Sequence, residues 1–536
     1  MQPLRINLTI KTLKRSTLCT YLGIFLTALA LGSVQAKVIT YTFPAEFPTS
    51  DVYDVRINQQ PVQAYQTKKG SFLSFGMTGP VELSVTYPSA PKEVIIRPLS
   101  AGVTATITGK TCKFKLPRPM NLSMETDGDL SHPLFIFANP KLTNIPSKSD
   151  PNVTFFEAGK IYDVGEIILQ DNETLYLEGG AVVRGVIRAR NARNVAIRGA
   201  GIIDASTRKH KINMLVFREC DRVLLENIFI LDPFGWTIHL SGSKNIKLTN
   251  TRVLGWRQNC DGIDIEYSKN VHADGCFWQT TDDCVAVKAI YPPGVTGIPF
   301  EEMINPETLG KHKVPRIPGD VVGNILITNS VLSNAHGQTF EIGFELRVDQ
   351  VSGVTFRNCD IIHGGVGFSI HNGDRATISN MLLDDIRVEQ VNRLIDFTLG
   401  ISIYSDDCPP PYRRSNPKRQ AVPKERRPAQ ANNVYQWYVP AEQDLGKFEA
   451  NRGLIRNITV RNMKVLTPPR HNSIFSGYNT KHNISGVRIE GLKIQGDPIR
   501  AIKDLGVYLH HVNDIQVTAE PAPQPTQDNG PHPPRR

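Results

Sequence analysis

The fold is decided by a short pattern that recurs along the chain: Asn194-Val-Ala-Ile197, Arg222-Val-Leu-Leu225, Asn245-Ile-Lys-Leu248 and Asn270-Val-His272. A polar corner residue, most often Asn, comes before Val or Ile and, in most copies, a second apolar residue. Further copies follow at Asn324-Ile325 and Gly353-Val354, and later ones begin near Met381, Ile458, Val487 and Ile515. Most intervals between the apolar anchors are 23 to 29 residues long.

A repeat of this length is typical of a solenoid, in which each coil is one short unit that stacks on its neighbours. The anchors are mostly β-branched, which favours strands. No copy contains the longer apolar run at helical spacing that a helical repeat needs. We therefore predict an all-β protein whose main part, residues 153–518, is a right-handed parallel β-helix.

The segment before the repeat is organised differently. Residues 37–140 alternate apolar and polar side chains in short runs, as in Val81-Glu-Leu-Ser-Val-Thr-Tyr87, with Gly and Pro turns between them. This pattern predicts a small antiparallel β-sandwich domain. Residues 141–152 then form a predicted linker, which contains Pro146 and Pro151.

Two intervals are too long for one coil and indicate insertions at 290–321 and 404–453. Loops of this size often act as lids or binding loops. The second insertion is basic at its start and aromatic later, with Tyr435, Trp437 and Tyr438. Both a solvated loop and a substrate-contacting loop fit this composition.

The two ends are predicted to lie outside the folded part. Residues 1–36 combine basic residues, an apolar run from Leu22 to Leu31 and Val34-Gln35-Ala36, which indicates a secretory signal peptide. Residues 519–536 are rich in Pro and are predicted to be disordered. No other stretch approaches the roughly 18 apolar residues of a membrane span. A secreted or periplasmic protein is expected.

The net charge and the cysteine spacing limit which partners and cofactors the sequence predicts. The formal net charge of +10 falls to +6 without the four basic residues of the first 36, and the charge is not clustered as nucleic-acid binding requires. The cysteines have no CxxC or Cys/His spacing, so neither a zinc site nor a cofactor is predicted. One or two disulfides are compatible with export, although several cysteines fit core positions. A monomer is expected.

Three carboxylates mark the predicted site. Asp261 is followed 21 residues later by Asp282 and then Asp283. Because this separation is about one coil, we expect Asp261 and Asp282 on successive coils, roughly 4.8 Å apart along the axis. Neighbouring residues of a regular strand point to opposite faces, so Asp282 and Asp283 share a cleft only if the chain bends.

Such a cluster suits glycoside hydrolysis, in which one acid protonates the leaving oxygen and another carboxylate activates water. Crowding of like charges raises the pKa of one member and keeps it protonated. Two other interpretations stay open. One is a structural ladder or turn cluster of Asp and Asn side chains; the other is a calcium site made of Asp261, Asp264, Asp282 and Asp283.

The motifs themselves resemble a known family. Asn259-Cys-Asp-Gly-Ile-Asp264, Asp282-Asp-Cys-Val-Ala-Val287 and Ala335-His336-Gly337 resemble the Asn-Thr-Asp, Asp-Asp-Cys and Gly-His-Gly patterns of the polygalacturonases, glycoside hydrolase family 28. The segment Pro233–His239 is similar to one found upstream of them in bacterial members. The ordered set, which covers most of the solenoid, is more specific than any single motif.

This resemblance implies an inverting hydrolase that cleaves a pectic or related polysaccharide or oligosaccharide. Asp282 is then the general acid, and Asp261 and Asp283 hold the attacking water. His336 tunes the acid or contacts the sugar. The predicted substrate-binding residues are Asn259, Lys288, His371, Trp236 and Arg347.

One departure from the family concerns the substrate. The family has Arg-Ile-Lys where this chain has Ser369-Ile370-His371, so both cations that grip a galacturonate carboxylate are missing. Arg347 or the basic insertion is a candidate to replace them. Glu341 and Glu345 are either extra cleft carboxylates or partners of Arg347, and the ion pair is slightly favoured.

The layout of sandwich and β-helix also resembles the dextranases of glycoside hydrolase family 49, which implies a neutral or modified sugar at the cleavage site. Two other classes remain as alternatives. A calcium-dependent polysaccharide lyase would use the acids as ligands and Lys288 as a base, and a non-catalytic carbohydrate-binding β-helix would show no activity at all.

Overall fold

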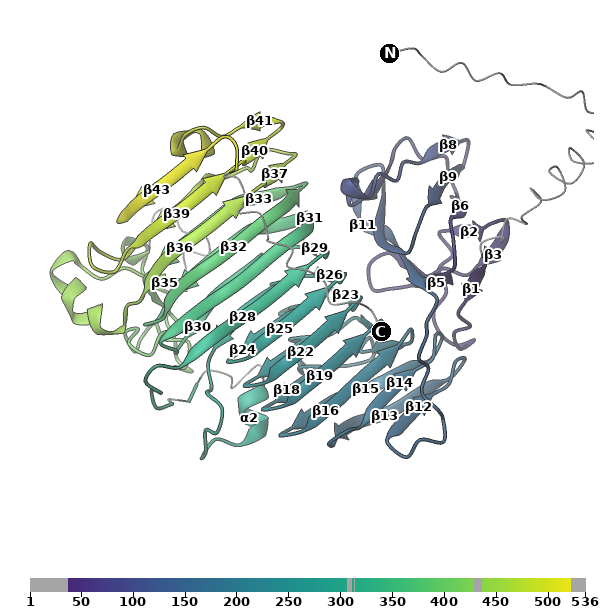
Figure 1. Ribbon diagram of the computed structural model, residues 1–536, viewed down its shortest axis with the longest axis horizontal. Coiled ribbons are helices and arrows are strands. Elements are labelled where there is room, and N and C mark those ends of the chain that lie inside the picture. The colour runs from purple at the N-terminus through teal and green to yellow at the C-terminus, as the bar shows by residue number, and fades with distance from the viewer. Residues whose placement is uncertain (1–36, 306–310, 313, 428–435, 522–536) are drawn as a thin grey trace, which may run out of the picture.

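The computed structural model describes residues 37–305, 311–312, 314–427 and 436–521. Within them lies one long parallel β-helix with a smaller β-sandwich beside its N-terminal coils (Figure 1). The solenoid predicted from the repeat is thereby confirmed. The predicted signal peptide and nearly all of the predicted tail lie outside the described residues.

The sandwich consists of two sheets. The first contains β1 (Val38–Thr40), β4 (Tyr65–Gln66), β5 (Ser71–Met77), β7 (Val94–Arg97), β10 (Met120–Thr126) and β11 (Asp129–Pro140). The second contains β2 (Asp54–Ile57), β3 (Gln60–Val62), β6 (Val81–Thr86), β8 (Thr106–Thr108) and β9 (Thr111–Leu116). Neighbouring strands in both sheets run antiparallel except β5 and β11, which run parallel. A short helix, η1 (Leu99–Ala101), follows β7.

The coils of the β-helix stack their strands in three rows, which share a single hydrogen-bonded sheet of 30 strands in the described chain. The long strands β13 (Ile161–Leu169) and β15 (Val182–Arg190) open the solenoid and span two rows. The first row continues with β18 (Leu215–Arg218), β21 (Ile238–Ser241), β24 (Ile263–Glu266), β27 (Val285–Ala289), β30 (Gln338–Leu346), the end of β31 (Gln350–Asn372), β33 (Val391–Leu399), β38 (Ser473–Ser476) and β42 (Val507–His510).

The second row contains β12 (Val153–Phe156), β14 (Thr174–Leu177), β16 (Arg193–Gly199), β19 (Asp221–Glu226), β22 (Lys244–Thr249), β25 (Lys269–Asp274), β28 (Val321–Thr328), the start of β31, β32 (Thr377–Val388), β36 (Leu454–Arg461), β39 (Ile484–Glu490) and β43 (Val512–Thr518). The third row contains β17 (Ile202–Asp204), β20 (Phe229–Leu231), β23 (Arg252–Leu254), β26 (Phe277–Thr280), β29 (Val331–Asn334), the middle of β31, the end of β32, β37 (Lys464–Val465) and β40 (Lys493–Ile494). A last short strand, β41 (Asp497–Pro498), pairs with β40 in antiparallel fashion.

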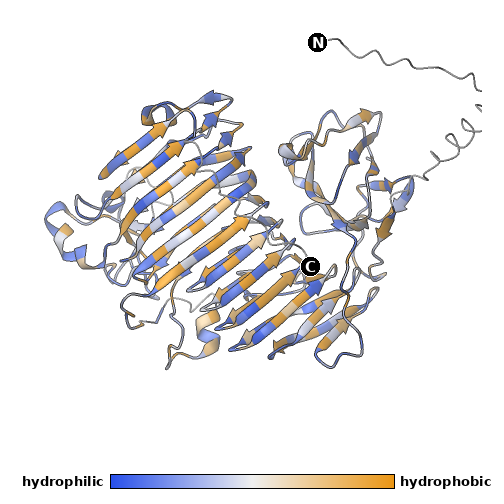
Figure 2. Cartoon of the chain, viewed as in Figure 1, coloured by the Kyte–Doolittle hydropathy of each residue, from blue (hydrophilic) through white to orange (hydrophobic). Residues whose placement is uncertain are grey.

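The apolar anchors of the repeat form one stacked column inside the second row. The registers place Val195 beside Val223, then Ile246, Val271 and Ile325, and the column continues through the later copies to Ile515. The members from Val195 to Val487 are at most 2% exposed. Figure 2 shows the resulting alternation of apolar and polar residues along the strands.

The polar corners have their own physical role. Asn194, Asn245, Asn270 and Asn324 have φ between 54° and 59°, a left-handed conformation that Asn adopts more readily than other side chains. Their side chains also bond from coil to coil, with Asn324 Nδ2 donating to Asn270 Oδ1 at 2.8 Å and Asn270 Nδ2 donating to Asn245 Oδ1 at 3.0 Å. The recurring Asn therefore turns the chain and links successive coils.

Aromatic residues join the sandwich to the third row. Phe72 packs against Phe229 with ring centroids 5.0 Å apart, and Phe137 packs against Phe277 at 5.5 Å. The buried guanidinium of Arg252 donates to Asn139 and, at 2.9 Å, to Asn121 of the sandwich. The sandwich therefore packs against the third row of strands.

The two predicted insertions leave the first row as loops. The first contains α2 (Phe300–Ile304) and packs against Trp236 through Ile290, Tyr291 and Met303. The second contains η2 (Lys424–Arg426), β35 (Trp437–Tyr438) and η4 (Glu442–Asn451), and β35 pairs with β34 (Ile401–Ser402) just before it. Another short helix, η5 (Ile502–Leu505), precedes β42.

Candidate active site

The three predicted carboxylates meet on the first row. Ile263 of β24 lies beside Val285 of β27, so two residues earlier Asp261 lies beside Asp283 rather than beside Asp282. The amide of Gly262 accordingly donates to the Asp283 carbonyl at 2.9 Å. Asp261 and Asp282 thus lie on successive coils, offset by one residue.

The predicted bend is present between β26 and β27. The Thr280 hydroxyl donates to the carbonyl of Asp282 at 2.7 Å, and residues 281–284 belong to no strand. Asp283 is 7% exposed and lies next to Asp261, which is 2% exposed, whereas Asp282 is only half-buried. The bend therefore sets one carboxylate toward solvent and two against the row.

Two glycines let the coils approach this closely. A Cβ on Gly337 would lie 2.4 Å from the carbonyl carbon of Asp282, and a Cβ on Gly262 would lie 2.4 Å from the carbonyl oxygen of Cys284. Both distances are shorter than any real contact of a side-chain carbon. The glycines in the Asn-Cys-Asp-Gly and His-Gly motifs are thus required by backbone packing.

Lys288 is the cation at the centre of the cluster. Its Nζ lies 3.3 Å from Asp264 Oδ1, 3.8 Å from Asp261 Oδ2 and 4.0 Å from Asp283 Oδ2. The same Nζ sits 4.5 Å from the centre of the Trp236 ring. Lys288 is 7% exposed, so its charge interacts mainly with these partners inside the protein.

Burial and crowding raise the pKa of each carboxyl. Burial, then the charges of Asp264 and Asp282, raise the pKa of Asp261 well above its ordinary value. Burial and the neighbouring Asp282 do the same to the pKa of Asp283. For Asp264, burial raises the pKa to about 6 against the opposing effect of Lys288.

Lys288 responds in the opposite sense. Burial alone would lower its pKa, but the charges of Asp264, Asp261 and Asp283 raise it well above the ordinary value. The lysine therefore stays charged at any pH at which the carboxyls titrate. Its charge favours the ionised form of at least one of them.

Asp282 has a different set of neighbours. Asn259 Nδ2 donates to Asp282 Oδ2 at 3.4 Å, and Lys211 Nζ donates to Asn259 Oδ1 at 2.7 Å. Burial raises the pKa of Asp282, while Lys288 lowers it, Glu341 raises it and His336 lowers it. His336 is exposed, and its amide donates to the Thr281 carbonyl at 3.1 Å. The structure thus places Asn259 and His336 near the half-buried carboxyl of Asp282.

The place of the family's basic pair holds a sealed polar network. The hydroxyl of Ser369 donates to Glu341, and His371 Nδ1 lies 3.0 Å from Glu341 Oε1. His371 Nε2 lies 3.6 Å from Asp396 Oδ1. Glu341, Ser369, His371 and Asp396 are all 0% exposed, and Phe344 stacks over His371 at 4.6 Å.

This network changes the part predicted for His371. With no exposed surface, His371 cannot contact a sugar, so its prediction as a substrate-binding residue was wrong. Burial alone would lower its pKa, but the charge of Glu341 and the bonds to Asp396 and Glu341 raise it to about 10. His371 is therefore the cation that balances two buried carboxylates.

Arg347 also lies elsewhere than predicted. Its side chain is 3% exposed, with Nη2 lying 3.3 Å from Asp406 Oδ1 and Nη1 donating to the His312 carbonyl at 3.2 Å. Arg347 therefore ties the two insertions together, and the contacts of the described residues include no ion pair between it and Glu341 or Glu345. Trp236 likewise is 8% exposed and supports Lys288, so it does not present a free ring to a sugar.

Sequence reasoning missed several residues at the site. Tyr404, at the start of the second insertion, is close enough for its pKa to be raised to about 12, first by burial and then by Glu345, while Arg414 lowers it and Asp282 raises it. Asp396 and Lys211 also join the polar contacts described above. No local motif marks these residues, because each reaches the site only through the stacking of coils.

The described residues offer little support for a metal site. No group of three or more His, Cys, Asp or Glu side chains in the described ranges is arranged to hold a metal ion. The ammonium of Lys288 instead occupies the place between Asp261, Asp264 and Asp283.

The seven cysteines described are all free and buried. The one or two disulfides that the sequence allowed are therefore not formed among them.

A family model supports the resemblance seen in the motifs over part of the chain. The model of the family described as Glycosyl hydrolases family 28 matches residues 186–403, which confirms the resemblance seen in the motifs. The matched segment contains Asp261, Asp282, Asp283 and the His336-Gly337 pair. No curated protein sequence matches the chain.

Several solved structures are similar to this chain, and Dex49A supports the same fold. Dex49A from Penicillium minioluteum is 13% identical, with a TM-score of 0.53 over 90% of this chain and 96% of that chain. That coverage takes in both the sandwich and the solenoid. A hyperthermoactive exopolygalacturonase from Thermotoga maritima is 16% identical over 69% of this chain and 84% of that chain, with a TM-score of 0.47. A family 28 exopolygalacturonase from Yersinia enterocolitica is 13% identical over 83% and 97%, with a TM-score of 0.43.

None of the described helices is a candidate for a membrane span. Across the ranges that the structure describes, every helix is too short or too polar to cross a bilayer.

Proposed function

We propose that this protein hydrolyses glycosidic bonds of a polysaccharide with inversion, using Asp282 as the general acid and Asp261 and Asp283 to hold the attacking water. The observation that carries the proposal is the split of the carboxylates into one half-buried member and two buried members from adjacent coils. An acid must reach the leaving oxygen, whereas the water needs a fixed pair of acceptors behind it.

The charges around the three acids support these roles. Burial and the neighbouring Glu341 favour the protonated form of Asp282, which an acid needs near neutral pH. Lys288 favours a negative charge on the inner pair, which a base needs. His336 and Asn259 lie beside Asp282, where they orient the acid or contact the sugar.

The same proposal assigns a neutral or modified sugar to the cleavage position. A galacturonate carboxylate needs a cation within reach, and the positions 369–371 supply only a sealed network that contains two carboxylates. Lys288 is already paired with three carboxylates. An unmodified uronate would therefore meet excess negative charge at this position.

The accompanying organisation is also proposed. A signal peptide at 1–36 directs export to the periplasm or the medium, and the mature monomer carries a sandwich domain at 37–140, a linker at 141–152, the catalytic β-helix at 153–518 and a tail at 519–536. N-terminal sequencing of the exported protein tests the cleavage after Ala36, and light scattering tests the monomer.

The decisive experiment is a screen of the purified protein against pectic, glucan and algal polysaccharides, with Asp282→Asn beside the wild type. We expect reducing ends from the wild type alone, and NMR of the first products should show an inverted anomeric configuration. Retained configuration, full activity of Asp282→Asn, or a chelator-sensitive product that absorbs in the ultraviolet contradicts the proposal. The last result would instead indicate a lyase.

A further inference from the structure

A cavity lies farther along the first row of strands, away from the acids. Its volume is about 470 Å³. One wall consists of the ends of β33, β38 and β42, and the other of residues from the second insertion. The lining residues used below are Arg427, Trp437, Tyr438, Tyr478, Tyr508 and His510.

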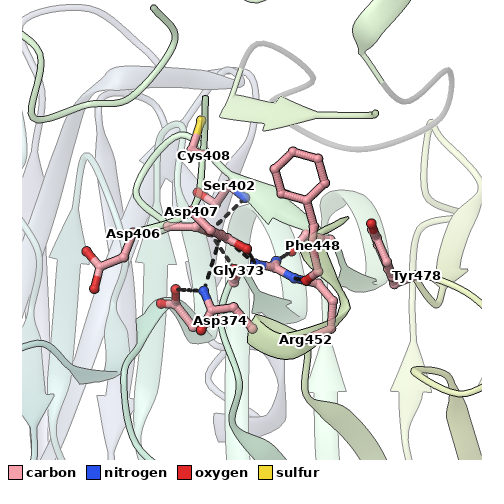
Figure 3. A network of polar contacts seen from close by, with 12 residues as sticks. Gly373, Asp374, Ser402, Asp406, Asp407, Cys408, Phe448, Arg452 and Tyr478 are labelled. Carbon is pink, nitrogen blue, oxygen red and sulfur yellow. Dashed lines mark hydrogen bonds and ion pairs between the residues drawn. The ribbon is translucent and has the colours of Figure 1, made fainter. Parts of the chain in front are cut away.

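The insertion wall is fastened to the coils by Arg452 (Figure 3). Both Asp407 carboxylate oxygens accept from Arg452 Nη2 at 2.6 Å, and the Gly373 carbonyl accepts from Nη1 at 2.6 Å. Arg452 Nε donates to the Phe448 carbonyl at 3.2 Å. Because Asp407 stands near the start of the insertion and Arg452 near its end, this network closes the base of the loop.

The same fastening sets the aromatic rings of the cavity. Tyr478 receives the Arg452 guanidinium 5.9 Å from its ring centre and donates its hydroxyl to the Leu445 carbonyl at 2.8 Å. Tyr438 is held by the pairing of β34 with β35. The wall is therefore formed before any ligand arrives, which lowers the entropic cost of binding.

The lining combines flat rings with a few polar groups. Tyr508 is 39% exposed, and His510 stacks with it at an interplanar angle of 19°. Arg427 Nε donates to the Val422 carbonyl at 2.7 Å. Flat apolar faces bordered by hydrogen-bonding groups are suited to a pyranose ring, which has apolar faces and a rim of hydroxyls.

The cavity lies on the same row of strands as the acids, and buried rings pack between the two sites. Trp437, which lines it, lies 5.3 Å from Phe344 and 5.8 Å from His371, measured between ring centres. From β27, which follows Asp283, four steps along the row lead through β30, β31 and β33 to β38. At roughly 4.8 Å per step this is about 19 Å along the axis, a distance that a short stretch of polysaccharide spans.

We infer that this cavity is a remote saccharide subsite, which holds a pyranose residue of the substrate chain several residues away from the bond that is cleaved. The inference rests on the proposed hydrolysis for the identity of the chain that occupies it. It makes the second insertion a specificity element, because the insertion supplies one wall of the subsite and leaves the acids untouched.

The test compares two variants of the same exposed strand. Tyr508→Ala removes a ring of the cavity, whereas Leu509→Ala removes an exposed side chain of β42 that does not line it. Each is placed in the Asp282→Asn background, and its binding to the pectic, glucan and algal polysaccharides of the screen is measured by affinity electrophoresis. We expect about a tenfold weaker binding for Tyr508→Ala alone. Equal binding by both variants, or no binding by the Asp282→Asn parent, overturns the inference.

Kinetics with the otherwise unmodified protein separate this inference from the proposed function. Tyr508→Ala should raise KM for long chains about tenfold, while kcat and the turnover of the shortest cleaved oligosaccharide stay unchanged. A wild type that binds through Tyr508 but releases no product contradicts the proposed hydrolysis and leaves the subsite standing. An active enzyme whose KM for long chains ignores Tyr508 contradicts the subsite alone.

Discussion

Two charge clusters lie on the first row of strands, only a coil or two apart, and they differ in one respect. Around Lys288, three Asp side chains gather and a fourth, Asp282, stays half-buried beside them. Around His371, Glu341 and Asp396 are enclosed under Phe344 with no exposed surface. Each cluster has a cation among carboxylates, but only the first has a carboxyl that a substrate can reach.

The comparison separates reactive charge from structural charge. A buried ion pair adds little net stability over apolar packing, yet removal of one partner is costly because the other charge stays buried and unpaired. The His371 cluster follows that rule. In the Lys288 cluster, burial and crowding also raise the pKa values of several carboxyls. Shifted pKa values of this kind are what acid and base catalysis requires.

The largest effect is expected from Asp282→Asn, which removes the only one of the clustered acids that faces solvent. Activity should fall about a thousandfold, within the range assigned to a general acid. Because Asn has nearly the same shape, the melting temperature should change little. Initial rates on the best polysaccharide and a thermal melt check both statements. If the loss of activity came with a large drop in melting temperature, Asp282 would instead have a structural role.

The next effect concerns the cation of the same cluster. Lys288→Met leaves three carboxyls without their opposite charge, and we expect a loss of about 3 kcal/mol in the free energy of unfolding. The pKa values of Asp261 and Asp283 should rise further, so the acidic limb of kcat/KM should move to higher pH. Denaturant unfolding and a pH–rate profile measure these changes, with the exposed Lys269→Met as the matched control. An unmoved acidic limb would show that Lys288 does not act on the base.

The pH dependence of stability tests the second cluster. The pKa of His371 is raised to about 10 in the folded protein, against an ordinary value of 6.5. Its contribution is therefore complete below about pH 6.5 and is lost as the pH rises through 10. Relative to the wild type, His371→Gln should be destabilised by about 2 kcal/mol at pH 6 and by much less at pH 10.

Thermal melts of the two proteins across this range supply the comparison. A difference between them that does not depend on pH would mean that His371 is neutral in the folded state. Activity at pH 6 should survive the substitution in whatever fraction remains folded, because His371 has no exposed surface.

The smallest effect is expected at a polar corner, away from both clusters. Asn270→Ala places Ala at a φ of 56° and removes one donated and one accepted side-chain bond of the Asn ladder. The cost should be about 1 kcal/mol, with unchanged kcat/KM. Chemical denaturation measures it, and an activity change would connect the ladder to the site.

The sequence predicted the parts of the site that depend on local spacing. The separation of 21 residues between Asp261 and Asp282 correctly brought two coils together, although the register selected Asp283 as the direct neighbour. The coil from Ile263 to Val285 takes 22 residues, whereas the preceding coil takes 25, so counting alone does not give the exact register. Lys288 was predicted to bind substrate, whereas the register places it among Asp261, Asp264 and Asp283.

Other parts of the site come from far along the chain and had no local signal. His371 was expected in the cleft because it stands where the family has a cation. Its burial follows from Glu341, from Asp396 and from the ring of Phe344, which approach from other coils. Arg347 was expected near the sugar and was drawn instead to Asp406 of the second insertion.

The sequence by itself determined the solenoid, because each coil repeats its own apolar anchor and its own left-handed corner, most often Asn, and these act over a few residues. It also determined which acids share a site, since residues about one coil apart in the sequence lie side by side on successive coils. Only the tertiary structure decided which of those acids faces solvent, which cation neutralises the others, and where the insertions close. Those outcomes depend on burial and charge among residues that are distant in sequence, and no local pattern encodes such energies.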